Sequence, residues 1–208
     1  NNSIIMPEYK LVYFAFRGLG EVPRQLFSLA GVKFENVRIE DADWDAGKRP
    51  ETPFGQMPVL FVDGKPIPQS FAINRYIANQ YGFAGKTPFE AALVDAFADQ
   101  FKDFNTEFKK YWYVKQGDEP GDVEEMKAKH GIPARDSFFP LVVKQLKKSG
   151  SGFIVGDAVT WVDVLVANAT DYITVLEKDL LNDYPEILAH KEKIHSLPGL
   201  KEWLKIRE

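Results

Sequence analysis

The sequence predicts an α/β domain followed by an all-α helical domain. Short strand-like segments alternate with helical ones in the N-terminal part of the chain. Strand patterning disappears after a glycine-containing linker at residues 82–88. Beyond the linker, apolar and aromatic residues recur every three or four positions, the period of an α-helix. Since alternating strands and helices are typical of α/β layers, the two parts differ in fold class.

The N-terminal elements follow one another in a recognisable order. Strands are expected over residues 10–14, 35–38, 58–62 and 66–67, and a turn at residues 62–65 joins the last two. Helices are expected to begin near Gly18 and Ala42, and a further one covers residues 71–81. The β-α-β-α-β-β-α order is that of a thioredoxin-like domain, which we place at residues 6–82.

The helical domain is expected over residues 88–208. Its first helix carries a stripe of large apolar residues that we interpret as core: Phe89, Leu93, Phe97, Phe101, Phe104, Phe108 and Tyr111. Further helices are expected over residues 123–148, 161–176, 185–195 and 199–207. Thr160 followed by Asp163 predicts a capping box, whose role we expect to be in folding.

Composition argues against several classes of function. A formal net charge of -4 with mixed signs offers no basic surface for nucleic acid. The absence of cysteine rules out disulfides, thiolate metal sites and cysteine nucleophiles. The three histidines lack partners at metal-ligand spacing, and no apolar run is long enough to span a membrane. We therefore expect a cytoplasmic protein without a metal and without nucleic acid or membrane partners.

An ordered set of motifs resembles the cytosolic glutathione transferases. The set comprises Tyr9 to Phe14, Arg17-Gly18, Ala42-Asp43-Trp44, Pro53 to Pro58 and Gln69 to Ile73. The chain is most similar to the sigma-class and nematode (nu-type) members, which are related to the haematopoietic-type prostaglandin D synthases. The resemblance implies a homodimeric glutathione S-transferase that adds the thiolate of its co-substrate, glutathione, to small hydrophobic electrophiles in detoxification.

Tyr13 is the residue to which the resemblance assigns the chemistry. A free thiol titrates near about pH 8.5, so its thiolate needs stabilisation at neutral pH. A neutral tyrosine hydroxyl, whose ordinary pKa is about 10, stabilises the thiolate by donating a hydrogen bond. The positive end of the helix near Gly18 adds to this effect. Taken alone, a tyrosine in a strand is more often structural. Arg17 either adds a positive field there or forms a salt bridge at the helix start.

The resemblance also implies a set of glutathione-binding residues: Tyr13, Trp44, Lys48, Gln56, Met57, Pro58, Gln69, Ser70 and Asp103. Pro58 looks like a cis-proline that presents the main chain of Met57 to the tripeptide, and an edge-strand proline is the alternative. The helix start at Gln69 and Ser70 suits the γ-glutamyl carboxylate, although Ser70 also fits a simple helix cap. Trp44 with Lys48, or with Arg49 in its place, would meet the glycine carboxylate.

Two further parts of the site depend on the helical domain. Asp95, Asp99 and Asp103 form an acidic row that by default faces solvent, but in the family Asp103 reaches glutathione bound to the other subunit of the dimer. The electrophile pocket is expected to include Phe14, Phe108, Tyr111, Trp112 and Leu204.

The sequence is also compatible with three alternatives to the transferase. One is a carrier of haem or another hydrophobic ligand with weak transferase activity, and another is a crystallin-like structural relative. A third is a glutathione-dependent prostaglandin D synthase. This third alternative is weakened because Leu19 stands where such enzymes carry an arginine, and Lys102 stands at one of their metal-responsive acids.

Overall fold

The computed structural model describes residues 6–45, 47 and 52–207. They divide into two compact units. The described residues up to Tyr81 form the first unit together with those from Ser196 onward, and residues 82–195 form the second.

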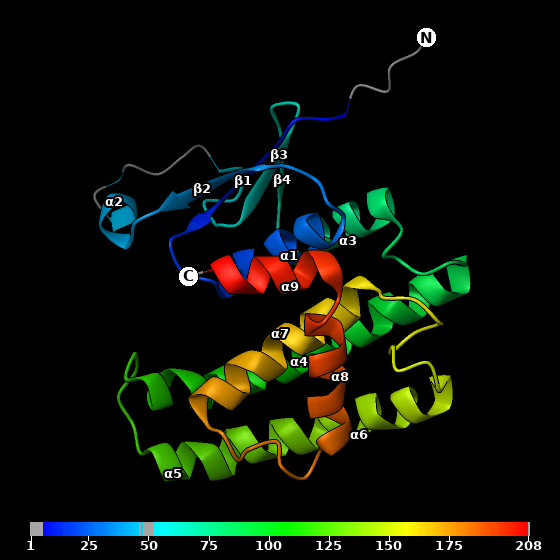
Figure 1. Ribbon diagram of the computed structural model, residues 1–208. Coiled ribbons are helices and arrows are strands. Elements are labelled where there is room, and N and C mark those ends of the chain that lie inside the picture. Colours follow the sequence, from blue (N-terminus) through cyan, green and yellow to red (C-terminus); the bar gives the residue numbers. More distant parts are fainter. Residues whose placement is uncertain (1–5, 46, 48–51, 208) are drawn as a thin grey trace. The chain divides into compact units, whose positions relative to one another are not determined.

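The first unit is built on a four-stranded mixed sheet with the order β2-β1-β3-β4 (Figure 1). Strand β1 (Tyr9–Phe14) runs parallel to β2 (Glu35–Ile39) and antiparallel to β3 (Val59–Val62). A tight turn leads from β3 into the antiparallel strand β4 (Lys65–Pro68). The sheet confirms the predicted thioredoxin-like α/β architecture.

Helices alternate with the strands along the first unit. A 3-10 turn, η1 (Gly18–Gly20), leads directly into α1 (Glu21–Leu29), and the short helix α2 (Asp41–Asp45) follows β2. Helix α3 (Ser70–Tyr81) packs against α1. The core of the unit consists of fully buried side chains from β1, β3 and these helices: Leu11, Leu26, Phe27, Val59, Leu60, Ile73 and Ile77.

The C-terminal helix α9 (Pro198–Ile206) belongs to the first unit, although the sequence places it after the other helices of the C-terminal part. Figure 1 shows it, in red, beside α1. The backbones approach closely, because a Cβ on Gly199 would lie 2.4 Å from the carbonyl oxygen of Ser28. The hydroxyl of Ser28 donates to the carbonyl of Gly199 at 2.9 Å. Glycine at position 199 therefore permits α9 to dock on α1.

The described residues of the second unit form helices without any strand, which confirms the all-helical prediction. Its elements in chain order are α4 (Pro88–Gln116), α5 (Val123–Met126), the π turn η2 (Lys127–Gly131), α6 (Ile132–Ser149), α7 (Trp161–Leu176) and α8 (Pro185–His195). The single helix predicted over residues 123–148 is therefore interrupted by a π turn. At this turn Gly131 lies against Tyr111, since a Cβ there would be 2.9 Å from Cδ1 of the ring.

Most of the predicted aromatic stripe on α4 is buried, but its first member is not. Phe101 and Phe104 pack with the rings of Phe138 and Phe139 on α6, and Phe108 and Tyr111 continue the buried stripe. Phe89, in contrast, is 73% exposed, so its assignment to the core was wrong. An α-helix turns by about 100° per residue, so each four-residue step moves a side chain by about 40° around the axis. Over three such steps Phe89 leaves the buried face.

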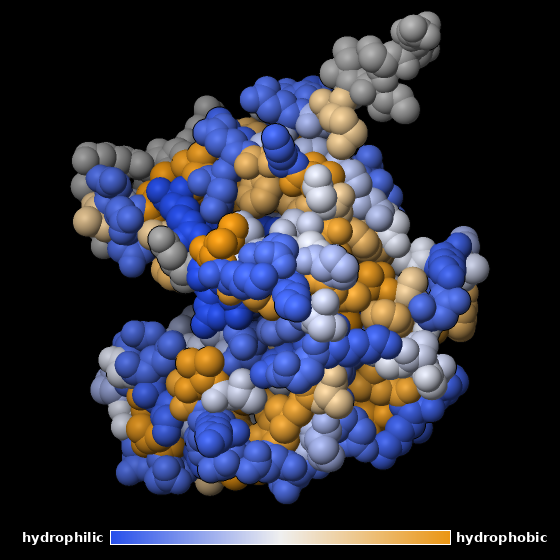
Figure 2. Space-filling view, in the orientation of Figure 1, coloured by the Kyte–Doolittle hydropathy of each residue, from blue (hydrophilic) through white to orange (hydrophobic). Residues whose placement is uncertain are grey.

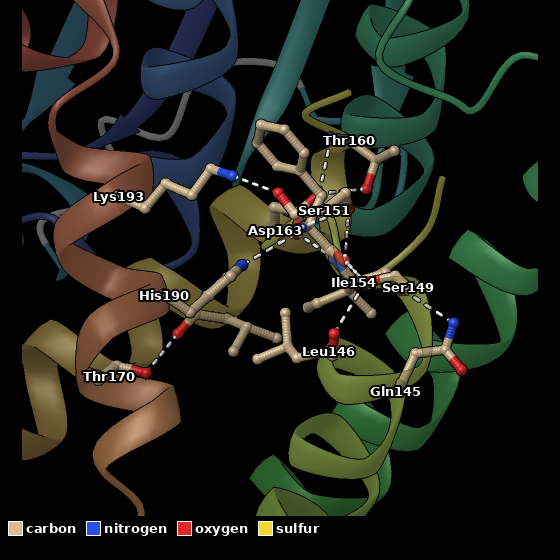
Figure 3. A network of polar contacts seen from close by, with 12 residues as sticks. Gln145, Leu146, Ser149, Ser151, Ile154, Thr160, Asp163, Thr170, His190 and Lys193 are labelled. Carbon is tan, nitrogen blue, oxygen red and sulfur yellow. Dashed lines mark hydrogen bonds and ion pairs between the residues drawn. The ribbon is translucent and has the colours of Figure 1, made fainter. Parts of the chain in front are cut away.

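A polar network surrounds the start of α7 (Figure 3). The carboxylate of Asp163, which is fully buried, accepts from the backbone N–H and the hydroxyl of Thr160 at 2.8 and 2.7 Å. It also accepts from the backbone N–H of Ile154 at 2.8 Å, and Nε2 of His190 lies 2.9 Å away. The predicted pairing of Thr160 with Asp163 is confirmed. Through Ile154 and His190, Asp163 also connects the preceding loop and α8 to the start of α7.

Candidate functional site

Tyr13 lies at the end of β1, and its hydroxyl oxygen accepts a hydrogen bond from the backbone N–H of Leu19 at 3.0 Å. The side chain is 5% exposed and belongs to a cluster with Val12 and Met57. The N–H of Leu19 belongs to η1, the turn that precedes α1. A bond accepted by the oxygen engages a lone pair, so the phenol proton is directed toward another acceptor.

Two glycines hold the ring of Tyr13 against the backbone. A Cβ on Gly18 would lie 2.5 Å from the Tyr13 hydroxyl oxygen, and a Cβ on Gly20 would lie 2.6 Å from Cδ1 of the ring. Gly18 also has a φ of +37°, which side chains with a Cβ rarely adopt. The Gly18-Leu19-Gly20 segment therefore allows the backbone to approach the phenol closely enough for the hydrogen bond from Leu19.

Aromatic residues surround Tyr13 on the same end of the sheet. Phe14 and Phe16 stack with their ring centroids 5.4 Å apart, and Tyr13 meets both rings edge-on. Trp44 of α2 meets Phe14 edge-on at 5.4 Å. The structure thus brings together four residues that the sequence proposes for the site: Tyr13, Phe14, Trp44 and Met57.

A second group of predicted residues lies where β3 and α3 begin. The side-chain amide of Gln69 donates to that of Gln56 at 3.1 Å, and both side chains are exposed. The Met57–Pro58 peptide is cis, as predicted. Gln69 has a φ of 74°, in the left-handed region that is uncommon for residues other than glycine. Such conformations often occur at ligand sites, because strain is retained where the geometry serves a function.

Ser70 is the first residue of α3, a position at which backbone N–H groups lack intrahelical acceptors. A carboxylate is the kind of ligand that such a helix start favours. Lys48 and Arg49 lie outside the described residues.

Arg24 of α1 is a buried residue of this region that sequence reasoning missed. Its side chain is fully buried, and its guanidinium carbon lies 5.8 Å from the centroid of the Tyr13 ring. Burial lowers the pKa of Arg24, and the nearby carboxylate of Glu21 opposes that shift. The signal in the sequence was a Glu-x-x-Arg pair in a segment that also supplies buried apolar residues.

The residues predicted from the helical part lie in different surroundings. Asp103 is exposed on α4, whereas Phe108 is 3% exposed and Tyr111 is fully buried. The Tyr111 hydroxyl donates to Glu177, and burial together with this carboxylate raises the pKa of Tyr111. Trp112 is half-buried and meets the ring of Tyr172 edge-on at 5.5 Å.

Leu204, the remaining residue predicted for the pocket, is half-buried on α9 in the first unit. A concavity of about 470 Å³ lies near the ends of α4 and α6 in the second unit, lined by Phe89, Lys148 and their neighbours. No residue predicted for the site lines it. This concavity is therefore not the site that the sequence predicts.

The described part of the chain has no group of three His, Asp or Glu side chains arranged to hold a metal ion. Among the helices described, none combines the length and the apolar character needed to cross a membrane. Figure 2 shows hydrophobic residues reaching the surface in several separate places among hydrophilic ones.

Two family models match separate parts of the chain. The model described as "Glutathione S-transferase, N-terminal domain" matches residues 9–79, and the one described as "Glutathione S-transferase, C-terminal domain" matches residues 102–207. The chain belongs to the glutathione S-transferase family. It is accordingly an enzyme that conjugates glutathione, its co-substrate, as the resemblance predicted.

Nematode glutathione S-transferases are among the most similar relatives. Glutathione S-transferase 1 of Ascaris suum is 46% identical over 199 residues, which cover 96% of each chain. A Nu-class enzyme from Haemonchus contortus is similar in structure, with a TM-score of 0.90, 45% identity and 98% coverage of both chains. A glutathione S-transferase from the hookworm Necator americanus, described as monomeric, has a TM-score of 0.92 and 44% identity, and the match covers 97% of this chain and 98% of that one.

Proposed function

We propose that Tyr13 stabilises the glutathione thiolate by donating its phenol proton in a hydrogen bond to sulfur. The observation that carries this proposal is the 3.0 Å hydrogen bond from the Leu19 N–H to the Tyr13 oxygen. This accepted bond sets the direction of the O–H group, because the two bonds occupy different positions around the oxygen. It also polarises the hydroxyl, which makes the phenol a stronger donor to an anion.

The glutathione peptide is bound by residues at the ends of the strands and helices of the first unit. The main chain of Met57, before the cis-proline, would pair with the extended tripeptide in the manner of an added strand. The start of α3 at Ser70, together with Gln56 and Gln69, would receive the γ-glutamyl carboxylate. Trp44 and Lys48 would meet the glycine carboxylate, with Arg49 as the alternative to Lys48.

The enzyme works as a homodimer in which Asp103 of one protomer reaches the glutathione of its partner. Support for this comes from the exposure of Asp103 on α4, since a carboxylate that serves a neighbouring protomer must lie at the surface. Phe54, in the loop before β3, is exposed and would contribute an aromatic side chain to the interface. The substrates are small hydrophobic electrophiles, and the role is detoxification in the cytoplasm.

The residues proposed to contact the electrophile come from both units, Phe14 and Leu204 from the first and Phe108, Tyr111 and Trp112 from the second. Trp112 and Leu204 are the members best suited to direct contact, because they are half-buried, whereas Phe108 and Tyr111 lie within the helical core of the second unit. In the described residues, no contact favours haem carriage or prostaglandin isomerisation over conjugation.

The kinetic test of this function is Tyr13→Phe, assayed with a general aryl electrophile. Loss of a hydrogen bond to a charged group costs about 1.5–3 kcal/mol, which corresponds to a fall in turnover of about ten- to a hundredfold. The Kd for glutathione should change much less, because the remaining contacts to the peptide are untouched. Equal losses in turnover and in affinity would contradict the proposed role of Tyr13.

A further inference from the structure

Helix α9 contacts a buried carboxylate of α1. Oε1 of Glu21, which is fully buried, accepts from the indole N–H of Trp203 at 2.9 Å and from the side-chain amide of Gln25 at 3.0 Å. Nη1 of Arg207, just after α9, lies 3.4 Å from the same oxygen. Two donors from the C-terminal end of the chain thus converge on one anion near its N-terminal end.

The same carboxylate faces the guanidinium of Arg24, at 3.6 Å from Nη1. The guanidinium also donates to main-chain carbonyls at the end of β1 and just after it. Nη1 donates to the carbonyl oxygens of Phe16 and Arg17, and Nη2 donates to that of Phe14, at 3.3 Å each. Nε donates to the side chain of Asn36 at 3.0 Å. The planar fork of an arginine suits this task, because its donors have fixed relative directions.

Phe14 is the last residue of β1, whereas Phe16 and Arg17 belong to the irregular segment between β1 and η1. Carbonyl groups that do not pair in a ladder need another donor when they are shielded from water. Arg24 supplies donors to the carbonyls of Phe16 and Arg17 as well as to that of Phe14, and thereby holds the segment that leads to the N–H of Leu19. That N–H is the group that orients the Tyr13 hydroxyl.

A contribution to stability alone does not explain why Glu21 and Arg24 are buried as an ion pair. Replacing a buried ion pair by apolar residues of similar volume is often neutral or stabilising, because desolvating two charges is costly. What a buried arginine provides and an apolar residue does not is a fixed set of donors next to a loop. The guanidinium also lies beside the Tyr13 ring, so the loop and the phenol share one support.

We propose that α9 is a positioning element for the catalytic hydroxyl of Tyr13. Trp203 and Arg207 hold the carboxylate of Glu21, which in turn holds the guanidinium of Arg24. Arg24 fixes the Phe14–Leu19 segment, and the N–H of Leu19 orients the hydroxyl. The inference rests on the proposed role of Tyr13 in stabilising the thiolate. Trp203 and Arg207 are positioning residues in this account, since their described contacts place them at Glu21 and not at the phenol.

The test compares Trp203→Phe with Lys205→Ala, both on α9, in the full-length enzyme. Trp203→Phe keeps an aromatic ring but removes the donor to Glu21, whereas Lys205 is exposed and pairs with Glu202. The readout is the pH profile of kcat/KM for the electrophile at saturating glutathione, which reports the thiol pKa in the enzyme–glutathione complex. Trp203→Phe should raise the apparent pKa of the profile by about half a unit, which lowers kcat/KM about threefold on its acid limb. Lys205→Ala should leave the profile unchanged.

A second variant keeps the proposal testable if Trp203→Phe does not fold. Arg207→Gln removes the other α9 donor near Glu21 and should shift the profile in the same direction by a smaller amount. A folded Trp203→Phe or Arg207→Gln enzyme with the wild-type pH profile would overturn the positioning role. So would a shift of the same size in Lys205→Ala.

The double variant Tyr13→Phe/Trp203→Phe separates this inference from the proposed function. If α9 acts through the phenol, Trp203→Phe should produce no further shift of the profile once the hydroxyl is absent. Equal shifts in the presence and absence of the hydroxyl would overturn the coupling of α9 to Tyr13. A wild-type profile in Tyr13→Phe alone would instead refute the role of Tyr13 itself.

Discussion

Gly20 lies directly against the ring of Tyr13, so closely that a single added carbon would be 2.6 Å from Cδ1. The backbone of Gly20 has a φ of -81°, which alanine adopts without strain. Gly20→Ala should therefore act through the ring alone. We expect kcat/KM to fall at least about tenfold and the free energy of unfolding to fall by about 1–3 kcal/mol, the range for inserting a methyl group into a packed site. Steady-state kinetics and chemical denaturation measure the two effects.

Gly31→Ala is the matched control for this substitution. Gly31 has a φ of +67° and nothing within 4 Å of an added Cβ. Alanine there loses stability through backbone strain of about 1–2 kcal/mol without touching the site. A comparable loss of kcat/KM in both variants would show that the effect of Gly20→Ala comes from general destabilisation and not from the Tyr13 ring.

Gln69→Gly should separate affinity from stability. Glycine relieves about 1–3 kcal/mol of backbone strain in the folded state. It also makes the unfolded chain more flexible, which favours the unfolded state by about 0.4–1 kcal/mol. The free energy of unfolding should therefore rise slightly or stay unchanged. The Kd for glutathione, measured by calorimetry, should rise several-fold because the amide is lost. Gln69→Asn, which keeps an amide and tolerates the left-handed region, should bind with intermediate affinity. An unchanged Kd in Gln69→Gly would remove Gln69 from the binding set.

Asp163→Asn and Thr160→Ala should affect folding without affecting chemistry. Each oxygen of Asp163 accepts one backbone N–H, from Ile154 or Thr160, and an amide nitrogen in either place would leave that donor buried without an acceptor. We expect a loss of about 1–3 kcal/mol in unfolding free energy for Asp163→Asn. Thr160→Ala should lose about 0.5–2 kcal/mol, the usual range for a helix cap.

Thermal melts and the kcat of the remaining folded enzyme measure these effects. A melting temperature unaltered in Thr160→Ala, or a reduced kcat per folded molecule in either variant, would contradict a purely structural role.

Asp103→Asn tests whether one protomer completes the site of its partner. The variant should weaken glutathione binding about tenfold, as expected when a charged contact of about 1.4 kcal/mol is lost. Light scattering should show a dimer for wild type and variant alike, since the exposed carboxylate is not needed for the fold. Wild-type affinity in the variant, or a monomer that binds glutathione as tightly as the dimer, would refute the shared site.

Sequence periodicity predicted the strands and most helices correctly, because their apolar residues follow the period of the element that they form. The break between α5 and α6 was missed. The sequence does mark it, because Gly131 is followed by Pro133, which has no N–H to donate within a helix and stands at the start of α6. Phe89 was placed wrongly for another reason, since it is an apolar residue on an exposed part of α4.

The candidate site was predicted in its residue types but not in its supports. Tyr13, Trp44 and Met57 were named from motifs, and they lie together. Arg24 was missed because arginine is usually exposed, and its burial here depends on carbonyl groups contributed by a loop. The backbone donor to Tyr13 was missed for a related reason, since an N–H is present at nearly every position and only the fold selects the one at Leu19. The boundaries of the glutathione-binding domain at residues 6–82 and of the helical domain at residues 88–208 stay predictions.

Titration of glutathione bound to the enzyme, followed by the ultraviolet absorbance of the thiolate, tests the role of Tyr13 most directly. In the wild type the bound thiol should titrate one to two units below its solution pKa of about 8.5. In Tyr13→Phe with glutathione still bound, the titration should return toward about 8.5, because the donor to the thiolate is gone. Identical titration curves for the two proteins would contradict the account.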